Sequence, residues 1–113
     1  MIEENRARYD LTIYRGEDYR KTSRWTIDKQ PIDFTGYTMK AQIKRMLNTN
    51  AVVAEFQFDI DPLLGKFTFY LTHEQTAKIV PGKYKWDLKV TNTTEDVKYY
   101  ICGDVKVIGR VTE

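Results

Sequence analysis

Four acidic residues have types and spacings that could support carboxylate chemistry: Glu55, Asp59, Asp61 and Asp87. A glycosidase-type site needs two carboxylates held across a cleft, with the pKa of one of them raised. Asp59 and Asp61 instead flank a predicted turn that ends at Pro62, where carboxylates commonly cap backbone N–H groups. Their spacing also resembles the start of a calcium-binding loop, but the glycine and the distal glutamate of such a loop are missing. We therefore predict neither a catalytic carboxylate pair nor a metal site.

His73 and Cys102 are the single histidine and the single cysteine of the chain. A catalytic histidine needs a nucleophile within reach, yet the one serine, Ser23, is not part of a Gly-x-Ser-x-Gly elbow. We expect His73 to be exposed and Cys102 to be a small buried hydrophobe in a strand. One cysteine cannot form an intrachain disulfide, and the pair cannot form a zinc cluster. The prediction is a protein that is not an enzyme and binds no cofactor.

The glycines and basic residues do not indicate a phosphate-binding loop or a nucleic-acid-binding surface. The glycines are dispersed, no Gly-Lys-Ser/Thr motif occurs, and the net charge is only +2. The bases instead lie in three predicted strands. Lys83, Lys85 and Lys89 share one strand face, Lys40 and Lys44 share another, and a third strand contains Arg20, Lys21 and Arg24. Lysines in such positions make a solvated sheet face and prevent edge-to-edge aggregation. We predict no nucleic-acid partner, and an acidic protein surface remains an open alternative.

Length and composition indicate one soluble globular domain. The chain has 113 residues, of which 42% are hydrophobic and 30% charged. No segment approaches the roughly 20 apolar residues of a membrane span. Residues 1–10 are polar and do not resemble a signal peptide. We expect residues 1–8 to be a flexible N-terminal arm and residues 9–113 to be a single domain, with no membrane partner.

Alternation of apolar and polar residues is the strongest structural signal. Seven runs show it or are β-prone: residues 9–14, 19–27, 37–44, 52–58, 66–71, 83–90 and 97–108. A period of two is typical of half-buried strands, and short strands between turns favour a β-sandwich. Gly103 interrupts the last run, where we expect a bulge or bend. The predicted fold is an all-β, immunoglobulin-like sandwich of about seven strands.

Residues 71–90 predict a corner between two of these strands. Thr72 and Gln75 fit a capping box that begins a short helix, which Pro81 and Gly82 end. Tyr84 follows at the start of the next strand. In immunoglobulin-like sandwiches a tyrosine in this place packs inward and bonds through its hydroxyl to the loop backbone. We therefore predict Gly82 and Tyr84 to be a structural corner.

Several segments resemble a known family. These are Gly16-Glu17-Asp18, residues 31–43 (PIDFTGYTMKAQI), residues 65–69 (GKFTF), residues 81–88 (PGKYKWDL) and residues 103–107 (GDVKV). Over residues 9–107 the chain resembles the N-terminal domain of phage baseplate upper proteins and related small immunoglobulin-like domains of tailed-phage structural proteins. That resemblance implies a non-enzymatic virion component, present in the host cytoplasm during assembly. Family members usually carry further host-binding parts, so a chain of this length is expected to be a connector, cement or adaptor.

Outward tyrosines suggest where such a protein would meet its neighbours. Tyrosine is enriched at interfaces because it brings large area at low entropic cost. The predicted interface, in which Val53 is also expected to be outward, consists of Tyr14, Tyr70, Tyr100, Ile108, Arg6 and Arg8. The expected partners are other virion proteins of the tail or baseplate, met by several copies of this chain in a symmetric assembly. Alternatives are a capsid decoration or head–tail connector protein, a carbohydrate- or receptor-binding module, and an enzyme or inhibitor of host defence.

Overall fold

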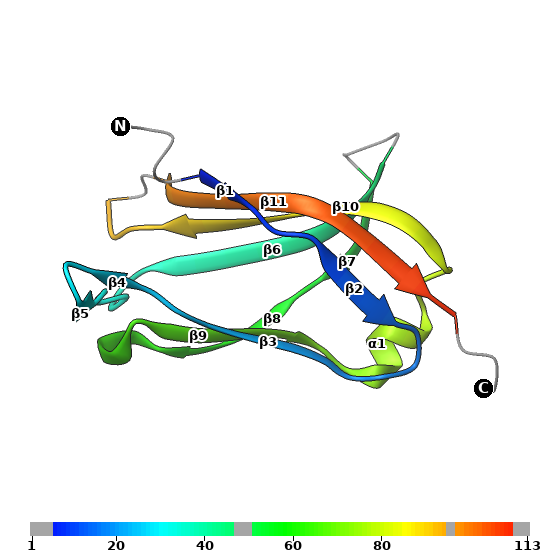
Figure 1. The fold of residues 1–113 in the computed structure, drawn as a ribbon, viewed down its shortest axis with the longest axis horizontal. Helices are drawn as coiled ribbons and strands as arrows, with labels where there is room; N and C mark the ends of the chain where they lie inside the picture. Colours follow the sequence, from blue (N-terminus) through cyan, green and yellow to red (C-terminus); the bar gives the residue numbers. More distant parts are fainter. Residues whose placement is uncertain (1–5, 47–50, 95–96, 110–113) are drawn as a thin grey trace.

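The computed structural model describes residues 6–46, 51–94 and 97–109, with the side chains of residue 6 and of residues 97–99 excepted. Two sheets pack face to face (Figure 1). The larger sheet has the order β1-β11-β10-β6-β7, with β2 also paired to β11. Its strands are β1 (Arg6–Arg8), β2 (Leu11–Tyr14), β6 (Thr38–Arg45), β7 (Val52–Glu55), β10 (Gly82–Thr91) and β11 (Val97–Ile108).

The smaller sheet and the connections complete the sandwich. This sheet has the order β3-β9-β8, formed by β3 (Tyr19–Arg24), β9 (Lys66–Leu71) and β8 (Gln57–Asp61). A two-stranded ribbon, β4 (Thr26–Ile27) and β5 (Gln30–Pro31), lies beyond β3. The 3-10 turn η2 (Pro62–Leu64) joins β8 to β9, and helix α1 (His73–Ala77) leads towards β10. No helix in the described ranges is long and apolar enough to cross a membrane.

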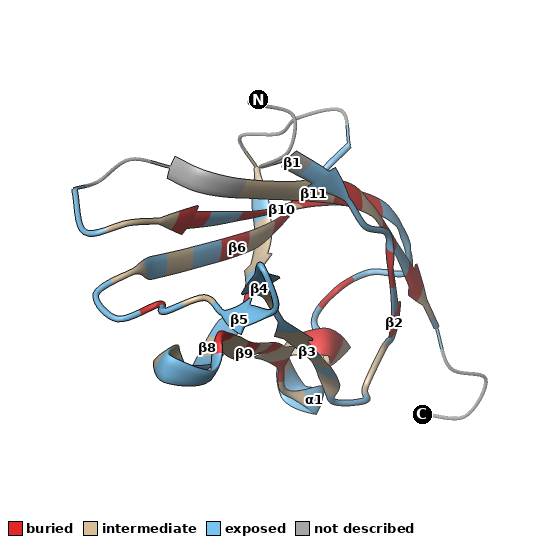
Figure 2. Ribbon diagram, turned by 60° about the vertical axis from the view of Figure 1, so that its left-hand side comes forward, coloured by how far each residue is buried: buried red, intermediate tan, exposed pale blue. Residues whose placement is uncertain are grey.

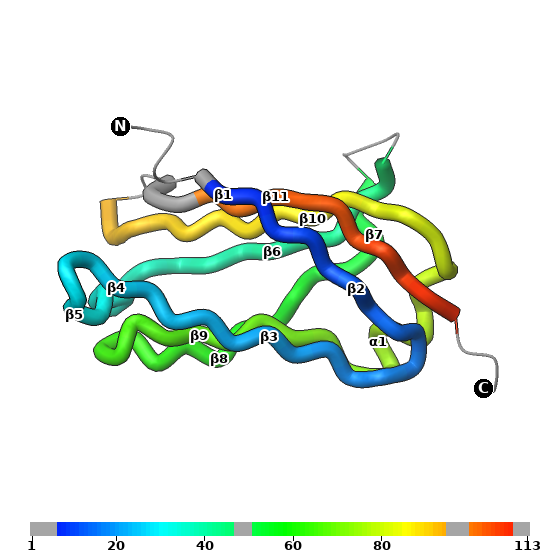
Figure 3. The backbone as a smooth tube through the Cα atoms, viewed as in Figure 1, coloured from blue at the N-terminus to red at the C-terminus, as the bar shows by residue number. Residues whose placement is uncertain are grey.

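This strand order is that of the predicted immunoglobulin-like sandwich. The structure has eleven strands in its described part where about seven were expected, because two predicted runs are divided and two short strands, β1 and β5, lie outside the predicted runs. Residues 52–61 pass from the large sheet to the small one at Phe56, whose N–H donates to the Ala41 carbonyl at 2.9 Å. The first run contains only β2, and β1 precedes it; both strands follow β11 in parallel (Figure 3).

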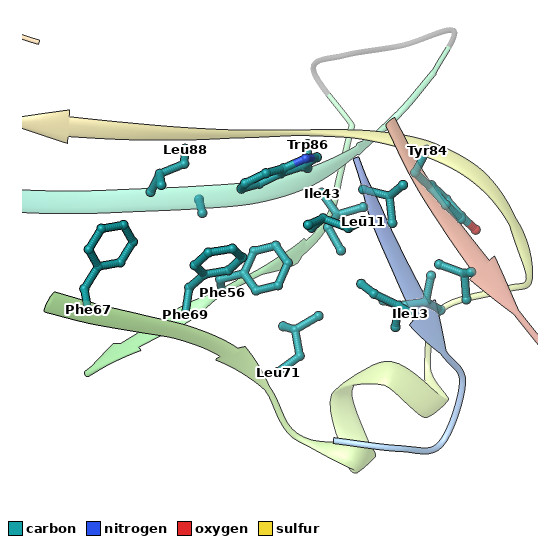
Figure 4. Packing of buried hydrophobic residues seen from close by; sticks show 14 of the residues in the cluster. Leu11, Ile13, Ile43, Phe56, Phe67, Phe69, Leu71, Tyr84, Trp86 and Leu88 are labelled. Carbon is teal, nitrogen blue, oxygen red and sulfur yellow. The ribbon is translucent and has the colours of Figure 1, made fainter. Parts of the chain in front are cut away.

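An aromatic cluster holds the two sheets together (Figure 4). Phe69 on β9 stacks on Trp86 on β10, with ring centroids 5.4 Å apart. Phe56, at the crossing between the sheets, meets Phe69 edge-on at 5.2 Å. Such ring pairs contribute about 0.5–1.5 kcal/mol each beyond the area that they bury. Buried and exposed bands alternate along β10 (Figure 2). The predicted inward phases are confirmed for Tyr84, Trp86, Leu88 and Val90 and for Phe34, Phe67, Phe69 and Leu71.

Two hydrophobic positions break the predicted alternation. Val52 is 49% exposed, whereas Val53 is half-buried and packs on the core. The register between β6 and β7 shifts here, since Ile43 pairs with Ala54 but Lys44 pairs with Val52. Val53 is therefore the extra residue of a bulge, and the prediction that it faces outward is wrong.

Gly103 does not divide the last strand, so the predicted bulge or bend is wrong. β11 runs without a register shift from Tyr99 to Val107 along β10, with Gly103 opposite Trp86. A Cβ atom on Gly103 would lie 2.1 Å from the carbonyl oxygen of Tyr9. That oxygen accepts a hydrogen bond from the Trp86 indole N–H at 2.6 Å. The glycine is required because the chain between β1 and β2 crosses directly over it.

Part of the predicted flexible N-terminal arm, residues 1–8, is a strand. Residues 6–8 form β1, in which Arg6 pairs with Tyr100 and Arg8 with Cys102. Residues 1–5 lie outside the described residues. The sequence 6–8 alternates charge with a single alanine, so its pairing depends on backbone hydrogen bonds to β11 rather than on burial.

Helix α1 begins at the predicted capping box. The Thr72 hydroxyl accepts from the Gln75 N–H at 3.2 Å, and the Gln75 side chain accepts from the Thr72 N–H at 2.9 Å. The turn after β2 is fastened to the helix by Asp18, whose carboxylate accepts from the His73 N–H at 2.6 Å. Buried Thr76 adds a bond to the Glu17 carbonyl at 2.8 Å. A five-residue helix is thus held by caps and tertiary bonds, since so short a helix is unstable alone.

Candidate protein-interaction surface

The outer face of the large sheet gathers most of the charged strand residues. We define this outer face by the side chains of β1, β2, β6, β10 and β11 that point away from the small sheet. Its described residues are Arg8, Thr12, Tyr14, Lys40, Gln42, Lys44, Lys83, Lys85, Asp87, Lys89, Tyr100, Cys102, Asp104, Lys106 and Ile108. On β2, β6, β10 and β11 these residues alternate with buried core residues, and Arg8 on β1 follows the register of β11.

A hollow of about 390 Å³ lies in the middle of this outer face. We call it the central hollow; its lining is Arg8, Lys44, Lys85, Trp86, Asp87, Tyr100, Cys102, Gly103 and Asp104. Cys102 pairs with Asp87 across the β10–β11 ladder, between the longer side chains of Tyr100 and Asp104. A short side chain among long ones leaves the space. Cys102 is half-buried on the outer face, so the prediction that it is a buried core residue is wrong.

One half-buried ionic group forms a wall of the central hollow. Asp87 accepts from the Lys44 ammonium at 3.4 Å and from the Tyr100 hydroxyl at 3.3 Å, both through Oδ2. The side chains of Lys44 and Asp87 are 23% and 16% exposed. At this burial an ion pair is less screened by salt than an exposed one. The three residues come from β6, β10 and β11, so the sheet register brings them together.

A second, more exposed ionic group lies on the opposite side of the central hollow. Asp104 receives the Arg8 guanidinium at 2.9 Å and the Lys85 ammonium at 3.7 Å. Asp10 lies 3.3 Å from the same Arg8 guanidinium and accepts the Asp104 backbone N–H at 2.9 Å. Exposed pairs of this kind contribute at most about 1 kcal/mol each. Their main effect is to hold Arg8 and Lys85 at the rim of the central hollow.

The structure separates the residues of the predicted interface into three places. Tyr100 and Arg8 line the central hollow. Tyr14 and Ile108 are register partners at the far end of the same outer face, where Tyr14 is 49% exposed and Ile108 half-buried. Tyr70 lies on the outside of the small sheet, with the Arg20 guanidinium 4.8 Å from its ring centroid. Arg6 begins β1 through its backbone, and its side chain lies outside the described part.

The residues of the predicted corner lie at the start of β10. Tyr84 is 8% exposed, and its hydroxyl donates to the Val80 carbonyl at 2.5 Å. Gly82 has φ of 154°, a backbone conformation that L side chains rarely adopt. Both residues close one end of the sandwich and lie away from the central hollow.

The four acidic residues considered for catalysis do not form one site. Glu55 and Asp87 belong to strands of the large sheet, whereas Asp59 and Asp61 belong to β8 of the small sheet. Glu55 accepts from the Gln42 amide at 3.3 Å. Asp61 precedes η2, but its side chain makes no cap hydrogen bond, contrary to expectation. Within the described ranges no three His, Cys, Asp or Glu side chains are grouped closely enough to hold a metal ion.

Three pKa shifts have local structural causes. Hydrogen bonds from the His73 backbone and ring lower the pKa of Asp18. Hydrogen bonds from the Thr35 hydroxyl and backbone lower the pKa of Asp33. Burial, with a smaller effect from Tyr9, raises the pKa of Tyr19 to about 12. These shifts reflect local turns and core packing.

Sequence reasoning missed the residues that complete the hollow. Alternation placed Lys44, Lys85 and Asp87 on polar phases, but it did not show that they meet Asp104 and Cys102. That grouping depends on the register of β6, β10 and β11, which is set by contacts between strands distant in sequence. Opposite charges at facing positions, such as Lys85 and Asp104, were the one available signal.

Comparisons with known proteins agree with the architecture. Residues 5–111 match the model of the family described as LtfC-like, beta-sandwich domain. No curated protein sequence matches the chain. The Listeria monocytogenes internalin-like protein lmo2027 is similar in structure, with a TM-score of 0.50 and 14% identity, over 88% of this chain and 27% of that protein. The chain thus spans about a quarter of that protein, and at this identity the similarity is one of fold.

A second solved structure has a lower TM-score. It comes from work on host recognition and biofilm formation by aggregative adherence fimbriae of enteroaggregative Escherichia coli. The TM-score is 0.47 and the identity 17%, over 86% of this chain and 90% of that one.

Proposed function

The chain belongs to the LtfC-like β-sandwich domain family, and we propose that it is a non-enzymatic docking module of a tailed-phage virion. The location we infer is the tail or baseplate, where several copies meet other virion proteins in a symmetric assembly. Support comes from the resemblance of its turn and core segments to phage baseplate domains. A rigid sandwich without disulfides also suits folding in a reducing host cytoplasm before assembly.

The outer face of the large sheet is the observation on which this proposal rests. It joins a hollow of about 390 Å³ to a surface of mixed charge with aromatic and aliphatic residues at intervals. The Lys44–Asp87–Tyr100 group is half-buried and held by three strands, so a partner meets side chains that are already ordered. Preordered side chains lower the entropic cost of association. Capsid decoration or head–tail connection would use the same surface.

Carbohydrate binding is supported less well by this geometry. A sugar platform needs neighbouring aromatic rings, whereas Tyr100 and Tyr14 on the described outer face are far apart. Tyr14 pairs with Ile108, eight residues along β11 from Tyr100, which is about 26 Å at 3.3 Å per residue. Trp86 lines the hollow but is 2% exposed. Charged groups therefore dominate the central hollow, which favours a protein partner.

Mass spectrometry of purified phage particles, together with sizing of the purified chain, tests the proposed function. We expect the chain to be present in particles in several copies, and concentrated protein to form oligomers or to bind particle proteins. A chain that is absent from particles and strictly monomeric at high concentration would overturn the proposal. Specific hits on a glycan array would replace docking with carbohydrate recognition.

A further inference from the structure

We propose that the outer face of the large sheet binds an acidic segment of a partner protein, with one partner carboxylate entering the central hollow. This inference rests on the proposed docking function and names the chemistry of the partner. The proposed binding surface includes the rim of the hollow, which we define by the exposed lysines of β6, β10 and β11. These are Lys40, Lys83, Lys85, Lys89 and Lys106.

Charge complementarity identifies the partner as acidic. On the outer face the described bases are Arg8, Lys40, Lys44, Lys83, Lys85, Lys89 and Lys106, and the acids beside them are Asp10, Glu55, Asp87 and Asp104. Bases thus outnumber acids on this face. On β10, Lys83 and Lys85 are two residues apart, a spacing of about 7 Å that an extended acidic segment repeats on one of its own faces.

The hydrogen-bond inventory of the hollow leaves donors for one more carboxylate. Asp87 is shared by Lys44 and Tyr100, and Asp104 is shared by Arg8 and Lys85. A guanidinium carries five N–H donors and each ammonium three, far more than two carboxylates engage. A partner carboxylate would receive charge-assisted hydrogen bonds there, which are about twice as strong as neutral ones.

The embedded acids favour a protein partner over a nucleic acid. Asp87 and Asp104 line the hollow itself, and Asp10 lies beside Arg8. A continuous phosphate backbone would place several charges over these carboxylates and be repelled, whereas a single partner carboxylate in the hollow can lie on the side of Arg8 and Lys85. The described outer face also lacks the closely spaced aromatic rings on which bases stack.

An NMR titration of the full chain tests the inference. The probe is a synthetic peptide with glutamate at alternate positions and blocked ends, and the control peptide carries lysine at those positions. We expect the glutamate peptide to shift amide resonances around Lys85, Asp87, Cys102 and Asp104. Binding should weaken at least about tenfold between 0.1 M and 1 M salt, because the Debye length shortens from about 10 Å to about 3 Å.

Matched charge reversals locate the site. Lys85→Glu should weaken binding of the glutamate peptide about tenfold, since it replaces an attraction at the rim with a repulsion. Lys89→Glu tests the same face at a position that takes no part in the two ionic groups of the hollow. Arg24→Glu makes the same change in net charge on the outside of the small sheet and should leave the affinity within about twofold. Thermal melting confirms that each variant is folded.

Three results would overturn the inference: no binding of the glutamate peptide, shifts centred on the small sheet, or equal weakening by Arg24→Glu. Tighter binding of a single-stranded DNA oligonucleotide than of the peptide would assign the face to nucleic acid instead. The proposed function fails separately. If the chain is present in particles in many copies but does not bind the peptide, only the inference of an acidic partner is contradicted. If the chain binds the peptide but is absent from particles, the proposed virion function is contradicted.

Discussion

At the scale of single residues, the close approach of the Tyr9 backbone explains why a glycine stands at position 103 of β11. Gly103 in a β-prone run predicted a bulge, yet the strand is regular and the glycine makes room for the Tyr9 carbonyl. That carbonyl satisfies the indole N–H of buried Trp86. The glycine, the tryptophan and the Tyr9 carbonyl form one unit from three distant segments. The sequence shows each residue type but not their meeting, because that depends on tertiary packing.

Replacing Gly103 with alanine should destabilise the fold strongly. The new Cβ would lie 2.1 Å from the Tyr9 oxygen, so the N-terminal strand must move and the Trp86 N–H loses its acceptor. We expect a loss of about 2 kcal/mol or more in the free energy of unfolding, measured by urea denaturation.

Gly109→Ala is the matched control for this change. A Cβ there would lie 3.1 Å from Cγ of the Pro81 ring, a contact that a small shift relieves. We expect a cost below about 1 kcal/mol. Equal effects at the two glycines would contradict the assigned role of Gly103.

Tyr84→Phe isolates the hydrogen bond of the corner. The ring stays in the core, while the bond from its hydroxyl to the Val80 carbonyl is lost. We expect the free energy of unfolding to fall by about 1 kcal/mol. Tyr14→Phe, at a ring that is 49% exposed, should change stability by less than about 0.5 kcal/mol. If thermal or urea unfolding shows no difference between the two variants, the Tyr84 hydroxyl does not stabilise the corner.

At the scale of elements, periodicity predicted the faces of the strands but not their pairing. The runs containing Phe67 and Trp86 turn the expected side chains inward. The capping box of Thr72 and Gln75 begins the helix as expected, because its signal is local. The bulge at Val53 was not predictable, since one extra residue depends on how β7 crosses to the small sheet. The central hollow was missed for the same reason: its residues meet only through the register.

The contact between Asp18 and helix α1 should be sensitive to acid. Hydrogen bonds from the His73 backbone N–H, first, and from its ring lower the pKa of Asp18 below the ordinary value of 3.8. Because the pKa is lower in the folded than in the unfolded chain, the ionised carboxylate stabilises the fold above about pH 4. That stabilisation is lost as the pH falls through the folded pKa. Wild type should therefore have a higher Tm than Asp18→Asn at neutral pH.

The same comparison repeated at successively lower pH provides the control. As the pH falls through the lowered pKa of Asp18, the carboxylate becomes protonated, so the Tm difference between wild type and Asp18→Asn should shrink. A difference that stays constant from pH 7 to the lowest pH would show that the charge of Asp18 does not stabilise its contact with His73.

At the scale of the whole molecule, the two sheets present different outer faces. The large sheet carries the central hollow with its lysine rim, whereas the small sheet places Tyr70 beneath Arg20. The sequence predicted lysine-rich strand faces and outward tyrosines, but not that Arg8 and Tyr100 share one face while Tyr70 lies on another. We therefore propose that partners bind the large sheet, and residues of the small sheet serve as controls.

The central claim is that this domain docks in a virion through the outer face of its large sheet. Cryo-electron microscopy of the intact particle whose genome encodes the chain tests it most directly. We expect density for the sandwich in several symmetry-related copies, with an acidic segment of a neighbouring protein over Lys85 and Asp87. Particles without this density, or copies that leave this face in solvent and contact neighbours through the small sheet, would contradict it.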